Sequence, residues 1–115
     1  TALKSLVLRD NRTGAEEIRP AHGLFVFIGA EPRTDWLGDA VLRDARGYIV
    51  TGRDVQGSGR RGLWQLQRDP FITETSVPGV FAAGDVRQGS VKRVAAAVGE
   101  GSITVSFVHA HLETL

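Results

Sequence analysis

Gly84 and Asp85 are the strongest candidates for a ligand-binding site in this sequence. They directly follow a short apolar run, V-F-A-A at residues 80–83. A glycine at the end of a buried strand lets a ligand or another backbone come close. A carboxylate at the carboxyl end of a parallel strand can accept hydrogen bonds from the hydroxyls of a sugar or a sugar alcohol. The dipeptide alone is more typical of an ordinary turn, so both interpretations stay open at this point.

A second motif, G-S-G-R-R-G at residues 57–62, matches the G-x-G-x-x-G fingerprint of dinucleotide-binding loops. That fingerprint binds pyrophosphate when a strand ends directly before it and a helix begins at its last glycine. Here the nearest strand candidate ends well before the motif, and Pro70 follows before a helix could complete two turns. The pattern therefore predicts a surface loop. We expect residues 52–69 to form a flexible insertion, pinned at one end by Trp64 and Leu66.

The other polar residues predict no site by their spacing. His109 and His111 are two residues apart and would point to different faces of a helix. The sequence contains no cysteine, so this chain offers no redox dithiol and no thiolate metal ligand. We therefore predict no metal site and no catalytic residue in this chain, and any redox chemistry would come from a bound cofactor.

Turn residues and apolar runs predict the elements that would position these residues. The turn-forming D-N-R-T-G at residues 10–14 separates two β-prone stretches, residues 3–8 and 16–19, which predicts a hairpin or meander. The continuous apolar run L-F-V-F-I at residues 24–28 predicts a central strand that is covered on both faces. The run at residues 80–83 predicts a second buried strand.

A long C-terminal helix is predicted between about residue 91 and residue 112. Apolar residues recur there at helical spacing, with a flanking stripe of Ile103 and Phe107. The spaced residues are Val94, Val98, Val105, Val108 and Leu112. So broad an apolar face predicts packing against a sheet on one side and another element on the other. Gly99 and Gly101 each cost about 1 kcal/mol relative to alanine in a helix, which indicates that something approaches the helix closely.

Length and charge narrow the class of protein. The 115 residues suit a single domain, and the formal net charge of +1 gives no field that would attract nucleic acid or an anionic membrane. No apolar run approaches the roughly 20 residues that a bilayer span requires. The chain has no methionine and no signal-peptide pattern at its start. We therefore expect a piece of a longer, cytoplasmic protein with neither a nucleic-acid nor a membrane partner.

Two longer strings change the interpretation of Gly84 and Asp85. T-S-V-P-G-V-F-A-A-G-D-V at residues 75–86 is followed by K-R-V-A-A-A-V-G-E-G at residues 92–101. Together they resemble the C-terminal flavin-binding block of the thioredoxin reductase family, a group of FAD-dependent pyridine nucleotide-disulfide oxidoreductases. The resemblance implies that Asp85, beside Gly84, holds a ribityl hydroxyl of FAD.

The resemblance also gives a role to the start of the predicted helix, near Lys92, Arg93 and Val94. Its positive end would face the N1/C2-carbonyl edge of the flavin ring, where negative charge accumulates on reduction. In much of the family, glutamine and alanine stand where Arg93 and Val94 fall here. The resemblance therefore implies a backbone N–H contact at these positions, whereas an arginine side chain would act on the flavin potential directly.

A third string, G-L-F-V-F-I-G-A-E-P-R-T at residues 23–34, resembles the family's G-x-F-x-x-I-G-x-x-P-N-T stretch, where the chain returns from the NAD(P)H domain to the FAD domain. Gly29 and the following proline keep their places, and Arg33 replaces the usual asparagine. The resemblance implies that residues 1–33 end the NAD(P)H-binding domain. Residues 34–115 would form the C-terminal part of the FAD-binding domain.

The resemblance implies an α/β fold, a partial FAD/NAD(P)-binding, Rossmann-like three-layer arrangement. The parent protein would be a flavoprotein that transfers hydride from NAD(P)H to FAD and delivers electrons to a disulfide or another acceptor. This chain alone would bind FAD weakly or not at all, would need the remainder of that flavoprotein as its partner, and would form homo-oligomers such as dimers through its exposed strand edges. The alternative is a non-catalytic binding or oligomerisation module that retains the flavin-domain shape.

Overall fold

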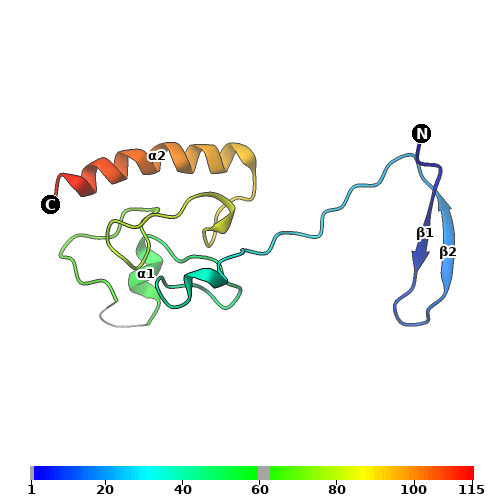
Figure 1. Ribbon diagram of the computed structural model, residues 1–115, viewed down its shortest axis with the longest axis horizontal. Helices are drawn as coiled ribbons and strands as arrows, with labels where there is room; N and C mark the ends of the chain where they lie inside the picture. Colours follow the sequence, from blue (N-terminus) through cyan, green and yellow to red (C-terminus); the bar gives the residue numbers. More distant parts are fainter. Residues whose placement is uncertain (1, 60–62) are drawn as a thin grey trace.

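The computed structural model describes residues 2–59 and 63–115. Their elements, in chain order, are the strands β1 (Ser5–Arg9) and β2 (Glu16–Pro20), the 3-10 helix η1 (Asp35–Leu37), the helix α1 (Arg53–Gly57), the 3-10 helix η2 (Gly84–Val86) and the helix α2 (Val94–Leu112). Figure 1 shows a hairpin at one end of an elongated molecule, an extended connection, and a body covered by α2.

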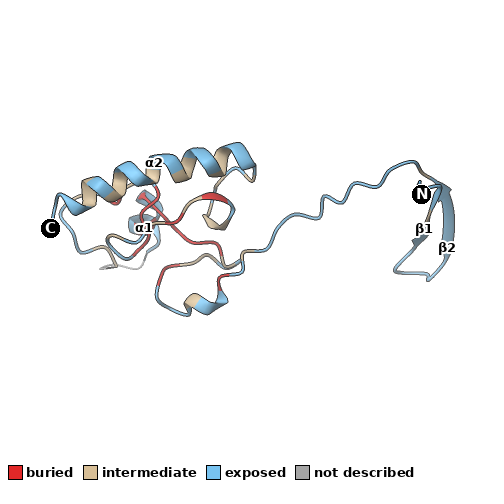
Figure 2. Ribbon diagram, turned by 45° about the horizontal axis from the view of Figure 1, so that its top comes forward, coloured by how far each residue is buried: buried red, intermediate tan, exposed pale blue. Residues whose placement is uncertain are grey.

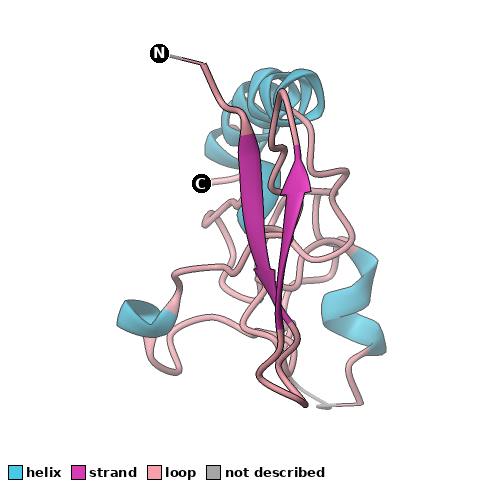
Figure 3. Ribbon diagram, turned by 90° about the vertical axis from the view of Figure 1, so that its right-hand side faces the viewer, coloured by secondary structure: helices cyan, strands magenta, loops and turns pink. Residues whose placement is uncertain are grey.

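The hairpin of β1 and β2 confirms the first predicted element. The strands are antiparallel, with Ser5 opposite Pro20. The carbonyl of Asp10 accepts the Gly14 amide at 2.8 Å, and Gly14 has a φ of 73°, a conformation that glycine adopts without strain. The Asp10 side chain also accepts the amide of Arg12 at 2.7 Å. The hairpin therefore follows from the residues of its own turn. Figure 3 shows β1 and β2 side by side.

The prediction of a central strand at residues 24–28 is wrong for this chain. These residues form no strand, and Phe25 and Phe27 are 80% and 91% exposed. The backbone is extended but has no neighbouring strand among the described residues, and a strand is stable only when its amides and carbonyls are paired. The apolar run therefore lies bare between the hairpin and the body (Figure 2).

The core lies in the body, and every described residue that is buried falls between Thr34 and Gly84. Two small apolar clusters make it up. One consists of Val41, Ile49 and Ala82, and the other of Leu42, Val50 and Val55. The predicted second strand at residues 80–83 is reduced to one antiparallel bridge, between Phe81 and Glu74.

Helix α2 confirms the predicted C-terminal helix, but of its predicted apolar face Phe107 packs inward while most of the valines do not. Within the described residues, the inward contacts are made by Ala97, Glu100, Thr104, Phe107 and His111. The residues of the predicted apolar face are mostly exposed, namely Val94, Val98, Val105 and Leu112, with Val108 partly buried. The close approach predicted at Gly99 and Gly101 is also absent among the described residues, because a Cβ at either would meet nothing within 4 Å.

None of the helices in residues 2–59 and 63–115 is long and apolar enough to cross a bilayer.

The start of the predicted insertion is not exposed. Val55, in the middle of α1, is fully buried in the core. Trp64 is half-buried against the same cluster, and its indole N–H donates to the carbonyl of Arg68 at 2.6 Å. Trp64 therefore pins the segment as predicted, whereas Leu66 is exposed and does not.

The G-x-G-x-x-G letters at residues 57–62 lie partly outside the described residues. The described part shows α1 ending at Gly57, and residues 63–70 contain no helix. A phosphate-binding fingerprint requires the opposite order, with a helix after its last glycine. The described residues therefore agree with the prediction that these letters form no dinucleotide loop.

Val55→Ala is expected to lower the free energy of unfolding by about 2 kcal/mol, because it removes two buried methyl groups and leaves a cavity. Urea denaturation followed by tryptophan fluorescence measures this change. Val98→Ala is the matched control, since Val98 is exposed on α2 and should change stability by less than about 0.5 kcal/mol. Equal changes in the two variants would show that α1 does not close the core.

Candidate functional site

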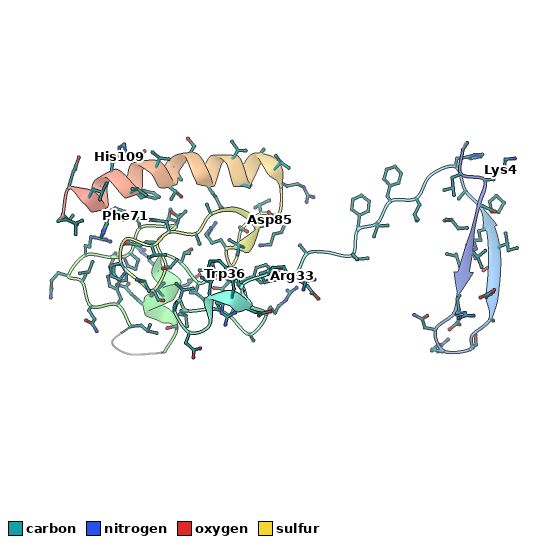
Figure 4. All side chains as sticks on the ribbon, viewed as in Figure 1. Lys4, Arg33, Trp36, Phe71, Asp85 and His109 are labelled. Carbon is teal, nitrogen blue, oxygen red and sulfur yellow. The ribbon has the colours of Figure 1, made fainter. Side chains whose placement is uncertain are left out.

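Gly84 and Asp85 lie where the body meets the amino-terminal part of α2 (Figure 4). Gly84 is buried and has a φ of 77°, and a Cβ placed on it would stand 3.2 Å from the Cβ of Ala97. This position therefore requires glycine for both its backbone conformation and its close contact with α2. Asp85 is exposed, and within the described residues its carboxylate has no hydrogen bond and no ion pair, so it is free to accept hydrogen bonds from a ligand.

Glu100, on the second turn of α2, holds this loop in place. Its Oε2 accepts the amide of Gly84 at 2.7 Å and Nε of Arg87 at 3.0 Å, while its Oε1 pairs with the second guanidinium nitrogen of Arg87. Both side chains are less than one-fifth exposed. The hydrogen bonds from Arg87 hold the pKa of Glu100 below its usual range and outweigh the opposing effect of burial, and the hydrogen bond from the Gly84 amide lowers this pKa further. Glu100 is therefore a carboxylate whose partners lie on both sides of Asp85.

The amino end of α2 offers unused donors close to the same loop. Ala97 is the first residue whose amide bonds to a carbonyl at the helix start, that of Arg93, at 3.0 Å. Helix geometry leaves the amides of Val94, Ala95 and Ala96 without an acceptor inside the helix, and no described side chain caps them. Free amides and the positive end of the helix dipole suit an anionic or electron-rich group.

Lys92 and Gly29 share a cavity whose lining does not include Asp85. The Lys92 ammonium donates to Oγ of Ser90 at 2.8 Å and to the carbonyl of Arg87 at 3.1 Å, and it lies 4.3 Å from the centre of the Tyr48 ring. Lys92, Tyr48 and Gly29 line one open cavity of about 330 Å³, whose lining does not include Asp85. The structure thus places Gly84 and Asp85 in the loop and Arg93 and Val94 at the start of α2, while Lys92 binds the carbonyl of Arg87 and shares a cavity with Gly29.

A second cavity of about 330 Å³ opens beside the loop. Ala83 and Val86, the neighbours of the Gly84–Asp85 dipeptide, are part of its largely apolar lining, as is Trp36. The lining of this cavity, like that of the first, does not include Asp85. An apolar groove of this kind can accept the flat apolar part of a ligand. The chain contains no cysteine, so it offers no thiol for disulfide exchange.

A second carboxylate fixes the opposite end of α2. Glu74 is fully buried and accepts two hydrogen bonds from Arg68, at 2.6 and 2.8 Å, and the amides of Phe71 and Gly79, at 3.0 and 2.8 Å. Burial raises the pKa of Glu74, but these four bonds, led by those of Arg68, outweigh it and lower the pKa overall. Arg68 also contacts Nδ1 of His111 on α2 at 3.1 Å. This network ties residues 68–79 to the end of α2.

The residues of these two networks were not predicted from the sequence. Their partners are far apart in the chain, so no local spacing reveals the pairs. A weak signal for a paired carboxylate was the position of Glu74 among Thr73, Thr75 and Ser76, a run that is buried in the structure. A second was the position of Glu100 between Ala97 and Thr104 on one face of the predicted helix. An acidic residue at a buried position requires a partner.

Comparison with solved structures defines the class of protein. Thioredoxin reductase from Streptococcus pyogenes superposes with a TM-score of 0.69 at 26% identity, over 99% of this chain and 31% of that one. Thioredoxin reductase from Lactococcus lactis superposes with a TM-score of 0.60 at 25% identity, over 97% of this chain and 31% of that one. The chain is therefore part of an α/β, Rossmann-like FAD/NAD(P)-binding fold, as predicted.

Comparison with sequences gives the family. The family model "Pyridine nucleotide-disulphide oxidoreductase" matches residues 3–101. Thioredoxin reductase of Treponema pallidum is 33% identical over 115 residues, which is all of this chain and 31% of the relative. That of Listeria monocytogenes is 30% identical over 102 residues, 89% of this chain and 26% of the relative. The chain belongs to the pyridine nucleotide-disulphide oxidoreductase family and spans 26–31% of the length of these relatives.

Glu74→Gln is expected to destabilise the fold by about 3–5 kcal/mol, because it leaves the Arg68 guanidinium without its charge partner in a buried place. Urea denaturation read by the fluorescence of Trp64, whose ring lies 5.3 Å from that guanidinium, measures the loss. The control is Glu16→Gln in the exposed pair with Arg9, which should cost less than about 1 kcal/mol. A comparably small loss for Glu74→Gln would contradict the assigned role.

Proposed function

We propose that this chain forms the C-terminal part of the FAD site in a thioredoxin reductase-like, NAD(P)H-dependent flavin oxidoreductase. The observation that supports this most is the exposed Asp85 carboxylate, which has no partner within residues 2–59 and 63–115, at a loop packed on the amino-terminal part of α2. Family membership and the likeness to thioredoxin reductases add to it. In this proposal the remaining two-thirds of such a protein supplies the phosphate-binding loop and most of the NAD(P)H domain.

The donors and acceptors of the site fit the chemistry of a flavin. Asp85 would accept hydrogen bonds from ribityl hydroxyls, and the amides of the first turn of α2 would face the electron-rich N1/C2-carbonyl edge. Bound FAD would supply the redox chemistry, which is acceptance of hydride from NAD(P)H and delivery of electrons to a disulfide or another acceptor. This chain's own residues would bind and orient the cofactor, and Arg93 and Val94 would take part through their backbone amides.

We also propose a domain boundary near residue 34. Residues 1–33 would end the NAD(P)H-binding domain, and residues 34–115 would complete the FAD-binding domain. The restriction of burial to the segment from Thr34 to Gly84 supports this boundary, as does the separation of the hairpin from the body (Figure 1). In such a protein the exposed run at residues 24–28 would pair with strands contributed from elsewhere in the NAD(P)H domain.

Asp85→Ala in the complete flavoprotein is expected to raise the Kd for FAD by about 10- to 100-fold, the effect of losing a hydrogen bond to a charged group. Quenching of flavin fluorescence during titration of the apoprotein measures the Kd. Asp39→Ala is the matched control, because Asp39 is also exposed but lies in another loop. An unchanged Kd for Asp85→Ala would contradict the proposal, and a protein that binds no FAD would favour the alternative of a non-catalytic module.

By itself, the chain is expected to self-associate through residues 24–28, because exposed apolar strands with unpaired backbones seek partners. Phe25→Ser combined with Phe27→Ser should shift the species seen in analytical ultracentrifugation toward the monomer. Val98→Ser with Val105→Ser removes a similar exposed apolar pair from α2 and should leave the association unchanged. A wild-type chain that stays a compact monomer at high concentration would overturn this expectation.

A further inference from the structure

We infer that Glu100 and Arg87 are positioning residues of the flavin site, which hold Asp85 in the orientation that binds the ribityl chain. This inference rests on the proposed function. The inference does not require either residue to touch the cofactor. Their role is to fix the short turn that presents the Asp85 carboxylate.

The geometry of the turn supports this role. The Gly84 amide donates to Glu100 directly before Asp85, and the Arg87 guanidinium donates to the same carboxylate two residues after it. The Arg87 amide also donates to the Gly84 carbonyl at 3.0 Å, which closes the 3-10 turn of η2. One side chain of α2 thus binds the backbone before Asp85 and the Arg87 side chain after it.

The side chain of Asp85 contributes nothing to the stability of this turn within the described residues, because it makes no hydrogen bond there. A loop held only by Asp85 itself would lose its order when the side chain turned toward a ligand. With Glu100 and Arg87 supplying the bonds, the carboxylate remains free while its backbone is fixed. Such preorganisation lowers the entropy lost when the ligand binds.

The charges of the pair also suit a site for an electron-rich ring. Glu100 lies on the second turn of α2, where an unpaired negative charge would oppose the positive end of the helix dipole. Arg87 compensates that charge with two hydrogen bonds. The pair therefore anchors the loop without weakening the field at the first turn.

A double-mutant cycle in the complete flavoprotein separates positioning from simple stabilisation. Glu100→Gln is expected to raise the Kd for FAD about tenfold when Asp85 is present and less than about twofold in an Asp85→Asn background. Arg87→Lys, which keeps the charge but loses the paired bonds, is expected to show the same dependence on Asp85. Flavin fluorescence titration of the apoproteins gives all the values, and it is independent of enzymatic turnover.

Thr104→Val is the matched control, since Thr104 joins the same face of α2 to Thr73 at 2.9 Å, one turn further along the helix. Any effect of this variant should be equal in both backgrounds. If Glu100→Gln or Arg87→Lys also changes the Kd equally with and without Asp85, the pair only stabilises the fold and the inference is overturned. A wild-type protein that binds no FAD would overturn the proposed function and this inference together, so the two failures are distinguishable.

Discussion

The hydrogen bond from the Gly84 amide to Glu100, at 2.7 Å, holds the loop that carries Asp85 against α2, and the candidate site depends on it. It joins the end of the segment that leaves the core to the second turn of α2, and its donor is a glycine where a side chain would strain the backbone and crowd Ala97. Because Arg87 binds the same carboxylate, the turn between the two donors has one orientation. Asp85 stands in that turn, and its exposure follows from the bonds of its neighbours.

Polar contacts hold α2 because the apolar core of this chain is small. The buried apolar clusters lie under α1 and around Ile49, and the inner face of α2 meets the body through a glutamate, a threonine and a histidine as well as Phe107. Near one end the helix is bound through Glu100, and near the other it is bound through His111, Arg68 and Glu74. Buried carboxylates are costly unless they are fully paired, and here each accepts at least three hydrogen bonds.

The sequence predicts those parts of the fold that depend on neighbouring residues. The hairpin follows from the turn at residues 10–14, and α2 follows from its length and spacing. The strand at residues 24–28 was predicted from its apolar run, but a strand also needs paired neighbours, and these are not among the described residues. The prediction that the valine face of α2 is packed was wrong for the same reason. Valines at helical spacing indicate an apolar face, but they do not say which element covers it.

The candidate site likewise has parts that the sequence predicts and parts that only the structure reveals. Gly84, Asp85 and the start of α2 are contiguous features that a motif can reveal, and the structure brings them together. Lys92 and Gly29 were predicted from the two family-like strings, and in the structure they line one cavity, with Lys92 also bonded to the carbonyl of Arg87. Arg87 and Glu100 pair across 13 positions of the chain, so only the folded structure reveals them.

The most direct test is hydrogen exchange of the Gly84 amide, measured by NMR on the folded protein. The account predicts that this amide is protected and shifted downfield, because it is buried and donates to a carboxylate, while the amide of exposed Gly89 exchanges quickly. A Gly84 amide that exchanges as fast as that of Gly89 would show that the loop is not bound to α2, and the arrangement described for Asp85 would be wrong.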